Sequence, residues 1–99
     1  MEKVVRDGKV AVIYGPDYGG GWYSWYGYDQ MLFDPTIVAM LEKDDVDWDA
    51  IQKYAKRMYD CPVPALEIGW VPEGAEFIIH EYDGSEQIWL KDKLKWLKA

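Results

Sequence analysis

The chain has little of the chemistry on which most catalytic and metal sites depend. Its 99 residues include one cysteine and one histidine, so it offers neither an intramolecular disulfide nor a Cys–His cluster for zinc. No apolar run approaches the roughly 18 residues of a membrane-spanning helix, and residues 1–7 lack the apolar stretch of a signal peptide. The sequence therefore predicts a protein of a reducing cytoplasm, without metal ion, cofactor or membrane anchor.

Positive charge is also scarce. Eleven Lys and Arg residues stand against eighteen Asp and Glu residues, which gives a net charge of −7. Four of the lysines lie in the last nine residues, and the rest of the chain carries a net charge of −10. Such a body repels phosphate, so direct binding of DNA or RNA is disfavoured. The acidity could serve solubility alone, or attract a basic partner surface by imitating nucleic acid.

Turn and cap signals divide the chain into short elements. The pairs Asp7-Gly8 and Asp83-Gly84 predict tight β-hairpins, because both positions of such a turn favour positive φ. Asp34-Pro35 predicts a helix start, and a second helix is expected from Asp47 to about Tyr59. The predicted strands are residues 3–6, 9–14, 66–71, 75–82 and 87–90.

Hydrophobic periodicity completes this prediction. The second helix should bury one face, made of Trp48, Ile51, Ala55 and Met58. A stripe of Leu90, Leu94 and Leu97 predicts a short C-terminal helix. We expect a single domain over residues 1–99 with an α+β fold, in which a small antiparallel sheet built from β-hairpins is packed on one side by two central helices.

Residues 14–28 form an unusual segment, expected to be irregular. Twelve of its fifteen residues are Gly, Tyr or Trp, and it holds seven of the sixteen aromatic residues of the chain. Loops of this length are often functional. Gly19-Gly20-Gly21 can direct N–H groups toward one point as an anion-binding nest, and Trp22, Trp25 and Tyr26 can stack on a planar ring. Alternatively, Trp22 and Trp25 close one end of the core, and the glycines permit a tight chain crossing.

A nucleotide would use both devices, with its phosphate in the nest and its base between the rings. A nearby guanidinium would have to supply positive charge. The predicted ligand-binding residues are Tyr14, Gly19, Gly20, Gly21, Trp22, Trp25, Tyr26, Arg6 and Arg57. The glycine run is neither a Walker loop, which needs a following Lys-Ser or Lys-Thr, nor a dinucleotide fingerprint, which needs a following helix.

No group of residues predicts catalysis. His80 is expected to be an ordinary strand residue and Cys61 a structural one, while Ser24 lacks the Gly-x-Ser-x-Gly context of a hydrolase. Four strand glutamates could do acid–base work or hold a divalent metal, but a solvated acidic face is the expected arrangement: Glu67, Glu76, Glu81 and Glu86. We therefore expect a binding protein rather than an enzyme.

Three stretches resemble a family of small proteins found in bacteriophage and prophage genomes. They are GGGWYSW at residues 19–25, LFDPTIV at residues 32–38 and WVPEGAEFIIHEYDGSE at residues 70–86. The tail from Gln87 and the Cys-Pro-Val-Pro connector depart from the usual pattern of the family. The resemblance implies a phage origin and a location in the cytoplasm of the bacterial host.

A phage origin implies an anti-defence role, because small phage proteins without catalytic motifs often block host immunity. We expect a homo-oligomer that sequesters a nucleotide-derived immune signal in the loop of residues 14–28 without cleaving it. One alternative is an acidic inhibitor that imitates nucleic acid and covers a host defence enzyme. Its acidic residues would be Asp44, Asp45, Asp47 and Asp49. Another alternative is a structural or assembly protein of the phage.

Overall fold

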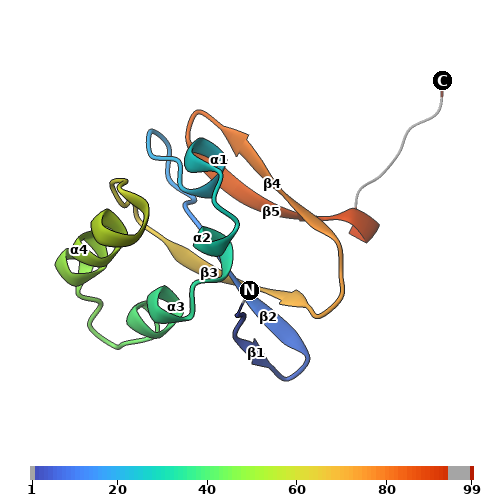
Figure 1. Cartoon of the computed structure of the whole chain (residues 1–99). Coiled ribbons are helices and arrows are strands. Elements are labelled where there is room, and N and C mark those ends of the chain that lie inside the picture. The colour runs from blue at the N-terminus through green and yellow to red at the C-terminus, as the bar shows by residue number, and fades with distance from the viewer. Residues whose placement is uncertain (1, 94–98) are drawn as a thin grey trace.

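The computed structural model describes residues 2–93 and residue 99 (Figure 1). These residues form two small antiparallel sheets, four short α-helices and one 3-10 turn. In chain order the elements are β1 (Val5–Arg6), β2 (Lys9–Tyr14), α1 (Tyr23–Tyr26), α2 (Gln30–Phe33), α3 (Pro35–Leu41), α4 (Trp48–Tyr59), β3 (Glu67–Pro72), β4 (Phe77–Tyr82), β5 (Ser85–Leu90) and η1 (Lys91–Lys93). The predicted α+β class is confirmed, although the strands form two sheets instead of one.

Both predicted hairpins are present. Strand β2 pairs with β1 and with β3 in the order β1-β2-β3, and β4 pairs with β5 in a separate two-stranded sheet. Asp7 and Gly8 have φ values of 51° and 75°, and Asp83 and Gly84 have values of 51° and 85°. These left-handed conformations give the turn a twist that matches the flanking strands.

Strand β2 is buried on both faces. Ala11 and Ile13 belong to a core cluster with residues of α3 and α4, whereas Val10 and Val12 pack with α2 and the β4–β5 hairpin. Figure 1 shows the pair α3 and α4 on one side of β3, and the β4–β5 hairpin on the other. The prediction of helices on one side of a single sheet is therefore incomplete, because the second hairpin covers the opposite face.

The buried stripe of α4 is rotated from its predicted position. Ile51 and Ala55 are buried as expected, but Trp48 and Met58 are exposed. Tyr54 and Tyr59 pack against the core in their place. The polar tips of these two tyrosines explain the rotation, because both hydroxyls reach a buried acceptor on α3.

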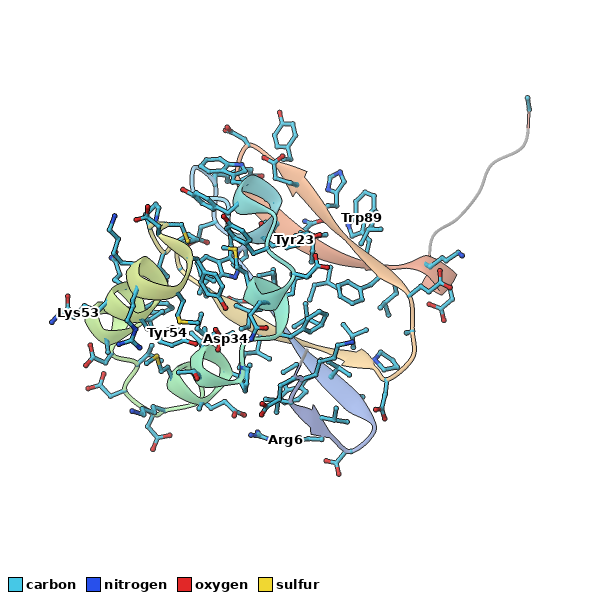
Figure 2. All side chains as sticks on the ribbon, in the orientation of Figure 1. Arg6, Tyr23, Asp34, Lys53, Tyr54 and Trp89 are labelled. Carbon is cyan, nitrogen blue, oxygen red and sulfur yellow. The ribbon has the colours of Figure 1, made fainter. Side chains whose placement is uncertain are left out.

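That acceptor is Asp34, which is 1% exposed. Its Oδ1 accepts hydrogen bonds from the backbone N–H groups of Thr36, at 2.9 Å, and Ile37, at 3.4 Å, as the predicted N-cap of α3. Its Oδ2 accepts hydrogen bonds from the hydroxyls of Tyr54, at 2.8 Å, and Tyr59, at 2.5 Å. One carboxylate thus caps α3 and joins it to α4; Figure 2 labels Asp34 and Tyr54.

This cluster predicts a loss of stability at alkaline pH. Burial, and then the hydrogen bond to Asp34, raise the pKa of Tyr54 and of Tyr59 above the usual value of 10.0. Below pH 10.0 both the folded and the unfolded chain keep the phenolic protons, so the stabilisation is complete there. Above it the unfolded chain loses protons that the folded chain retains, so the free energy of unfolding should fall as the pH rises.

Urea denaturation at a series of pH values from about 8 to about 11 measures this decline. The variant Tyr59→Phe cannot lose a proton at this position, so its free energy of unfolding should fall less steeply than that of the wild type. Equal slopes for the two proteins would contradict the role assigned to this hydroxyl.

Two further predictions concern the segment of residues 14–28 and the C-terminal helix. The segment of residues 14–28 is not wholly irregular, since it contains α1 and is followed at once by α2. Leu90 ends β5 instead of beginning a helix, and Leu94 and Leu97 lie outside the described residues. Within residues 2–93, no helix is long and apolar enough to cross a membrane.

Candidate functional site

The Gly-aromatic segment closes around the turn of the β4–β5 hairpin. The N–H of Gly19 donates to the carbonyl of Asp83 at 2.8 Å, and the hydroxyl of Ser85 donates to the carbonyl of Pro16 at 2.6 Å. The N–H of Glu86 donates to the carbonyl of Gly15 at 2.8 Å. We call residues 15–26, together with the hairpin turn that they enclose (residues 81–86), the clasp.

A buried carboxylate holds the clasp together. Glu86 is 0% exposed, and its Oε1 accepts the N–H of Gly15 at 2.9 Å. Its Oε2 accepts the N–H of Trp22 at 3.0 Å, the N–H of Ser24 at 2.8 Å and the hydroxyl of Ser24 at 2.5 Å. The N–H groups of Trp22 and Ser24 lie at the start of α1, where amides lack acceptors within the helix. The anion site of the segment is therefore made by the N–H groups of Gly15, Trp22 and Ser24 and not by the predicted Gly19-Gly20-Gly21 run, and its anion is a side chain of the same protein.

This position corrects the prediction of a solvated face for Glu86. The sequence contains one signal that a glutamate of this hairpin has an unusual environment: the Asp83-Gly84 turn sets the register in which Glu86 lies directly opposite Glu81. Two like charges opposite each other on a hairpin are destabilising unless hydrogen-bond donors stabilise one of them. Ser24, which supplies two of those donors, was likewise missed as a structural residue.

Close packing explains why the clasp is rich in glycine. A Cβ atom added at Gly84 would lie 2.7 Å from the backbone nitrogen of Gly20 and 2.9 Å from that of Gly19. A Cβ at Gly21 would collide with the indole of Trp25. The glycines thus allow the two backbones to approach each other, which is the tight chain crossing considered as the alternative to a ligand site.

Trp22 is a core residue. It is 0% exposed, its Nε1–H donates to the carbonyl of Met31 at 2.9 Å, and its ring meets Tyr59 edge to face. Its ring is therefore not available for stacking on a ligand in this conformation. Core closure, the alternative reading of the sequence, applies to Trp22 and does not apply to Trp25, which is 52% exposed.

The other predicted ligand residues do not converge on one place. Tyr14 is half-buried at the end of β2, where its hydroxyl donates to Glu67 at 3.1 Å, and Tyr26 packs against the core. Arg57 lies on α4 with its guanidinium over the ring of Tyr54, 5.6 Å from the centroid. Each of these three side chains thus has a separate contact, and for Arg57 that contact is on α4.

Arg6 lies at the β1–β2 hairpin, away from α1 and its Tyr23 (Figure 2). Both ends of its guanidinium donate to the carboxylate of Glu42, and the group also lies over the ring of Trp70 at 5.6 Å. The prediction that Arg6 assists the loop is therefore corrected, because Glu42, which follows α3, engages it elsewhere.

The remaining candidates each have a separate contact. Glu67 accepts from Tyr14, Glu76 pairs with Lys91, and Glu81 accepts the N–H of Gly84 at 2.8 Å. Among the described residues, no three His, Cys, Asp or Glu side chains are placed to hold a metal ion. His80 stacks on Trp89 at 3.8 Å, and burial raises the pKa of Cys61.

Exposed aromatic and acidic side chains cover the outer surface of the clasp. Tyr18 is 72% exposed and Tyr82 is 70% exposed, and their rings meet edge to face at 6.4 Å. The indole Nε1–H of Trp25 donates to Glu81 at 3.4 Å. Asp17 and Asp83 are also exposed, and neither residues 14–29 nor residues 80–87 contain a lysine or arginine. The surface thus combines flat rings with charge of one sign.

No protein-family model matches the chain, and neither a curated protein nor a solved structure matches it. The resemblance to phage proteins therefore stays a prediction from three short stretches. The functional argument depends on the geometry of the clasp and on the charges around it.

Proposed function

We propose that this chain is a protein-binding domain that presents the clasp surface to a basic segment of a partner protein. The observation that carries the proposal is the set of exposed rings, Tyr18, Trp25 and Tyr82, beside carboxylates and without a cation among residues 14–29 and 80–87. Trp and Tyr rings attract the Lys and Arg side chains of a partner, and they are common among the residues that dominate binding energy at interfaces.

The anchoring of the clasp supports this function. Glu86 holds the backbone around Trp25 through hydrogen bonds to the neighbouring residues Trp22 and Ser24. A surface that is ordered before binding loses less conformational entropy when the complex forms. The buried carboxylate therefore favours affinity without touching the partner.

Nucleotide sequestration, the function expected from the sequence, has less support from this geometry. The carboxylate of Glu86 already occupies the backbone anion site made by Gly15, Trp22 and Ser24. In the predicted Gly19-Gly20-Gly21 nest, the N–H of Gly19 donates to the carbonyl of Asp83. A nucleotide phosphate on the outer surface would face Asp17, Glu81 and Asp83, and like charges repel at short range. A cationic ligand suits the same residues better.

The acidic cluster Asp44, Asp45, Asp47 and Asp49 is exposed in the α3–α4 connection and at the start of α4. Its charge would accelerate the encounter with a basic partner without needing direct contact. In the phage setting implied by the resemblance, that partner would be a host protein, and the domain would act as an inhibitor by covering its basic surface.

Titration with a short arginine-rich peptide tests the proposal. We expect the peptide to shift the NMR signal of the Trp25 indole N–H and the amide signals of residues 81–83, and the shifts should weaken with added salt. The same peptide with citrulline in place of arginine keeps its shape but loses its charge, so it should bind at least about fivefold more weakly.

Matched variants locate the effect. Trp25→Ala should weaken binding of the arginine peptide about fivefold, whereas Met58→Ala, which removes another large exposed side chain on α4, should leave it unchanged. If AMP or GMP shifted the clasp signals and the arginine peptide did not, the proposal would fail in favour of nucleotide capture.

A further inference from the structure

Strand β3 has an outer edge without a backbone partner among the described residues. The N–H of Glu73 donates to the carbonyl of Gly8, toward β2. Because hydrogen-bonding direction alternates along an antiparallel strand, Gly69 and Val71 also face β2, where they pair with Val12 and Val10. Ile68 and Trp70 then direct their N–H and C=O groups outward. In the described part of the chain, these groups have no backbone hydrogen-bond partner.

Pro72 supports this assignment. It occupies the next outward-facing position of β3, and proline, which has no N–H, occurs in sheets on the side that does not donate to a neighbouring strand. The open part of the edge is therefore short and centred on Ile68 and Trp70. Each of these residues offers one donor and one acceptor.

Hollows border this edge on both faces of the sheet. One, with a volume of about 460 Å³, lies between β3 and β5 and is lined by Tyr14, Gly69, Trp70, Trp89 and Leu90 among others. Another, of about 320 Å³, lies on the helical side and is lined by Leu41, Val46, Trp48, Leu66 and Ile68 among others. Successive side chains of an extended strand point to opposite faces, so a strand added at β3 would direct them alternately toward the two hollows.

We propose that β3 is a docking edge for an extended, basic peptide segment of a partner protein, which would add to the sheet as a fourth strand beside β1-β2-β3. Unpaired edge groups bind another backbone by the same hydrogen bonds that join strands within a sheet. This site is distinct from the clasp, and it recognises main chain rather than cationic side chains alone.

The negative charge beside the edge of β3 favours a basic peptide over a second copy of this chain. Glu67 and Glu73, both exposed, stand at the start of β3 and directly after its end, so they flank the open edge with negative charge. The guanidinium of Arg6 lies over the ring of Trp70, but its charge is paired with Glu42. A second copy of this chain has a net charge of −7 and would bring the same two glutamates to the contact, where like charges repel. A segment with lysine or arginine near each end, and with β-branched residues between them, complements the edge.

The probe is the synthetic peptide acetyl-Lys-Val-Thr-Val-Thr-Lys-amide, titrated into the ¹⁵N-labelled protein. We expect it to shift the amide signals of Ile68 and Trp70 and to slow their hydrogen exchange. The same peptide N-methylated at its four central residues cannot donate to β3 from those residues, and it should bind at least about tenfold more weakly. A peptide with glutamate in place of both lysines should bind about fivefold more weakly. Equal binding by the N-methylated peptide would overturn the proposal.

Two variants test the edge from the protein side. Trp70→Pro removes the outward N–H, which no strand of the described chain uses, and Trp70→Val removes the same indole but keeps that N–H. Strand addition predicts that Trp70→Pro binds the lysine peptide at least about fivefold more weakly than Trp70→Val. Equal affinities of two folded variants would contradict it, and if Trp70→Pro does not fold, the N-methylated peptide decides.

The site of the shifts separates this inference from the proposed function. Shifts at the Trp25 indole without shifts at Ile68 and Trp70 would support clasp binding and reject the docking edge, and the reverse pattern would do the opposite. Shifts of β3 that grow with protein concentration in the absence of peptide would identify a second copy as the occupant, and would overturn the assignment to a basic peptide.

Discussion

Replacing Glu86 with alanine is expected to lower the free energy of unfolding by about 3–5 kcal/mol. The substitution leaves the N–H groups of Gly15, Trp22 and Ser24 without the acceptor that they have in the folded chain. Each unsatisfied buried donor costs about 1–3 kcal/mol, and small domains have only about 5–15 kcal/mol of stability in total. Urea denaturation should show a lower midpoint for Glu86→Ala at an unchanged m-value.

Two other substitutions serve as comparisons for Glu86→Ala. Glu86→Gln keeps the shape of the side chain but turns one acceptor oxygen into an NH₂ group facing other donors, so it should also destabilise the fold clearly. Glu73→Ala removes an exposed carboxylate after β3 and should change the free energy by no more than about 0.5 kcal/mol. If Glu86→Ala behaved like Glu73→Ala, the carboxylate would not be what holds the clasp.

The Glu86 substitution should also have a local effect. Because the clasp backbone is bound mainly through this one side chain, the amides of Trp22 and Ser24 should exchange with solvent faster in Glu86→Gln than in the wild type, and the amides of β2 should change less. Hydrogen exchange followed by NMR measures the difference. Uniform acceleration over the whole chain would indicate global destabilisation without a specific loosening of the clasp.

Replacing Asp34 with alanine is the second substitution with a large expected effect, about 3–4 kcal/mol. The helix cap of α3 and the bonds from the hydroxyls of Tyr54 and Tyr59 are lost together. Asp47 offers a matched control, because it is the N-cap of α4, accepts the N–H of Ala50 at 3.0 Å and is exposed. Asp47→Ala should therefore cost only about 1 kcal/mol.

The difference between the two cap substitutions measures what the tyrosines add. In a background with phenylalanine at positions 54 and 59, Asp34→Ala should cost less than in the wild type, because the hydroxyls that need an acceptor are gone. Thermal or urea denaturation of the set gives the coupling energy. A cost for Asp34→Ala no greater than that for Asp47→Ala would contradict the bridging role.

The sequence predicted the elements whose stabilising contacts lie within a few residues. The turns at Asp7-Gly8 and Asp83-Gly84 depend on backbone conformations that these residue pairs adopt easily. The cap at Asp34 depends on N–H groups two and three residues later, and the second helix begins after Asp47, where its start was expected. The number of sheets and the rotated face of α4 were not predicted, because they depend on packing between elements distant in sequence.

The same distinction applies to the candidate site. By itself the sequence determined that residues 14–28 would be a glycine-rich, aromatic segment and that the body would be acidic, but it assigned anion binding to the N–H groups of Gly19 to Gly21. Only the tertiary structure decided that the donors are the N–H groups of Gly15, Trp22 and Ser24 and that their acceptor is Glu86, which lies 62 to 71 residues away from them. The hairpin register places Glu86 opposite Glu81, but that pairing does not say which of the two carboxylates is buried or which groups donate to it. Its environment is set when the hairpin and the loop meet, and that meeting also places Trp22 in the core and leaves Trp25 outside.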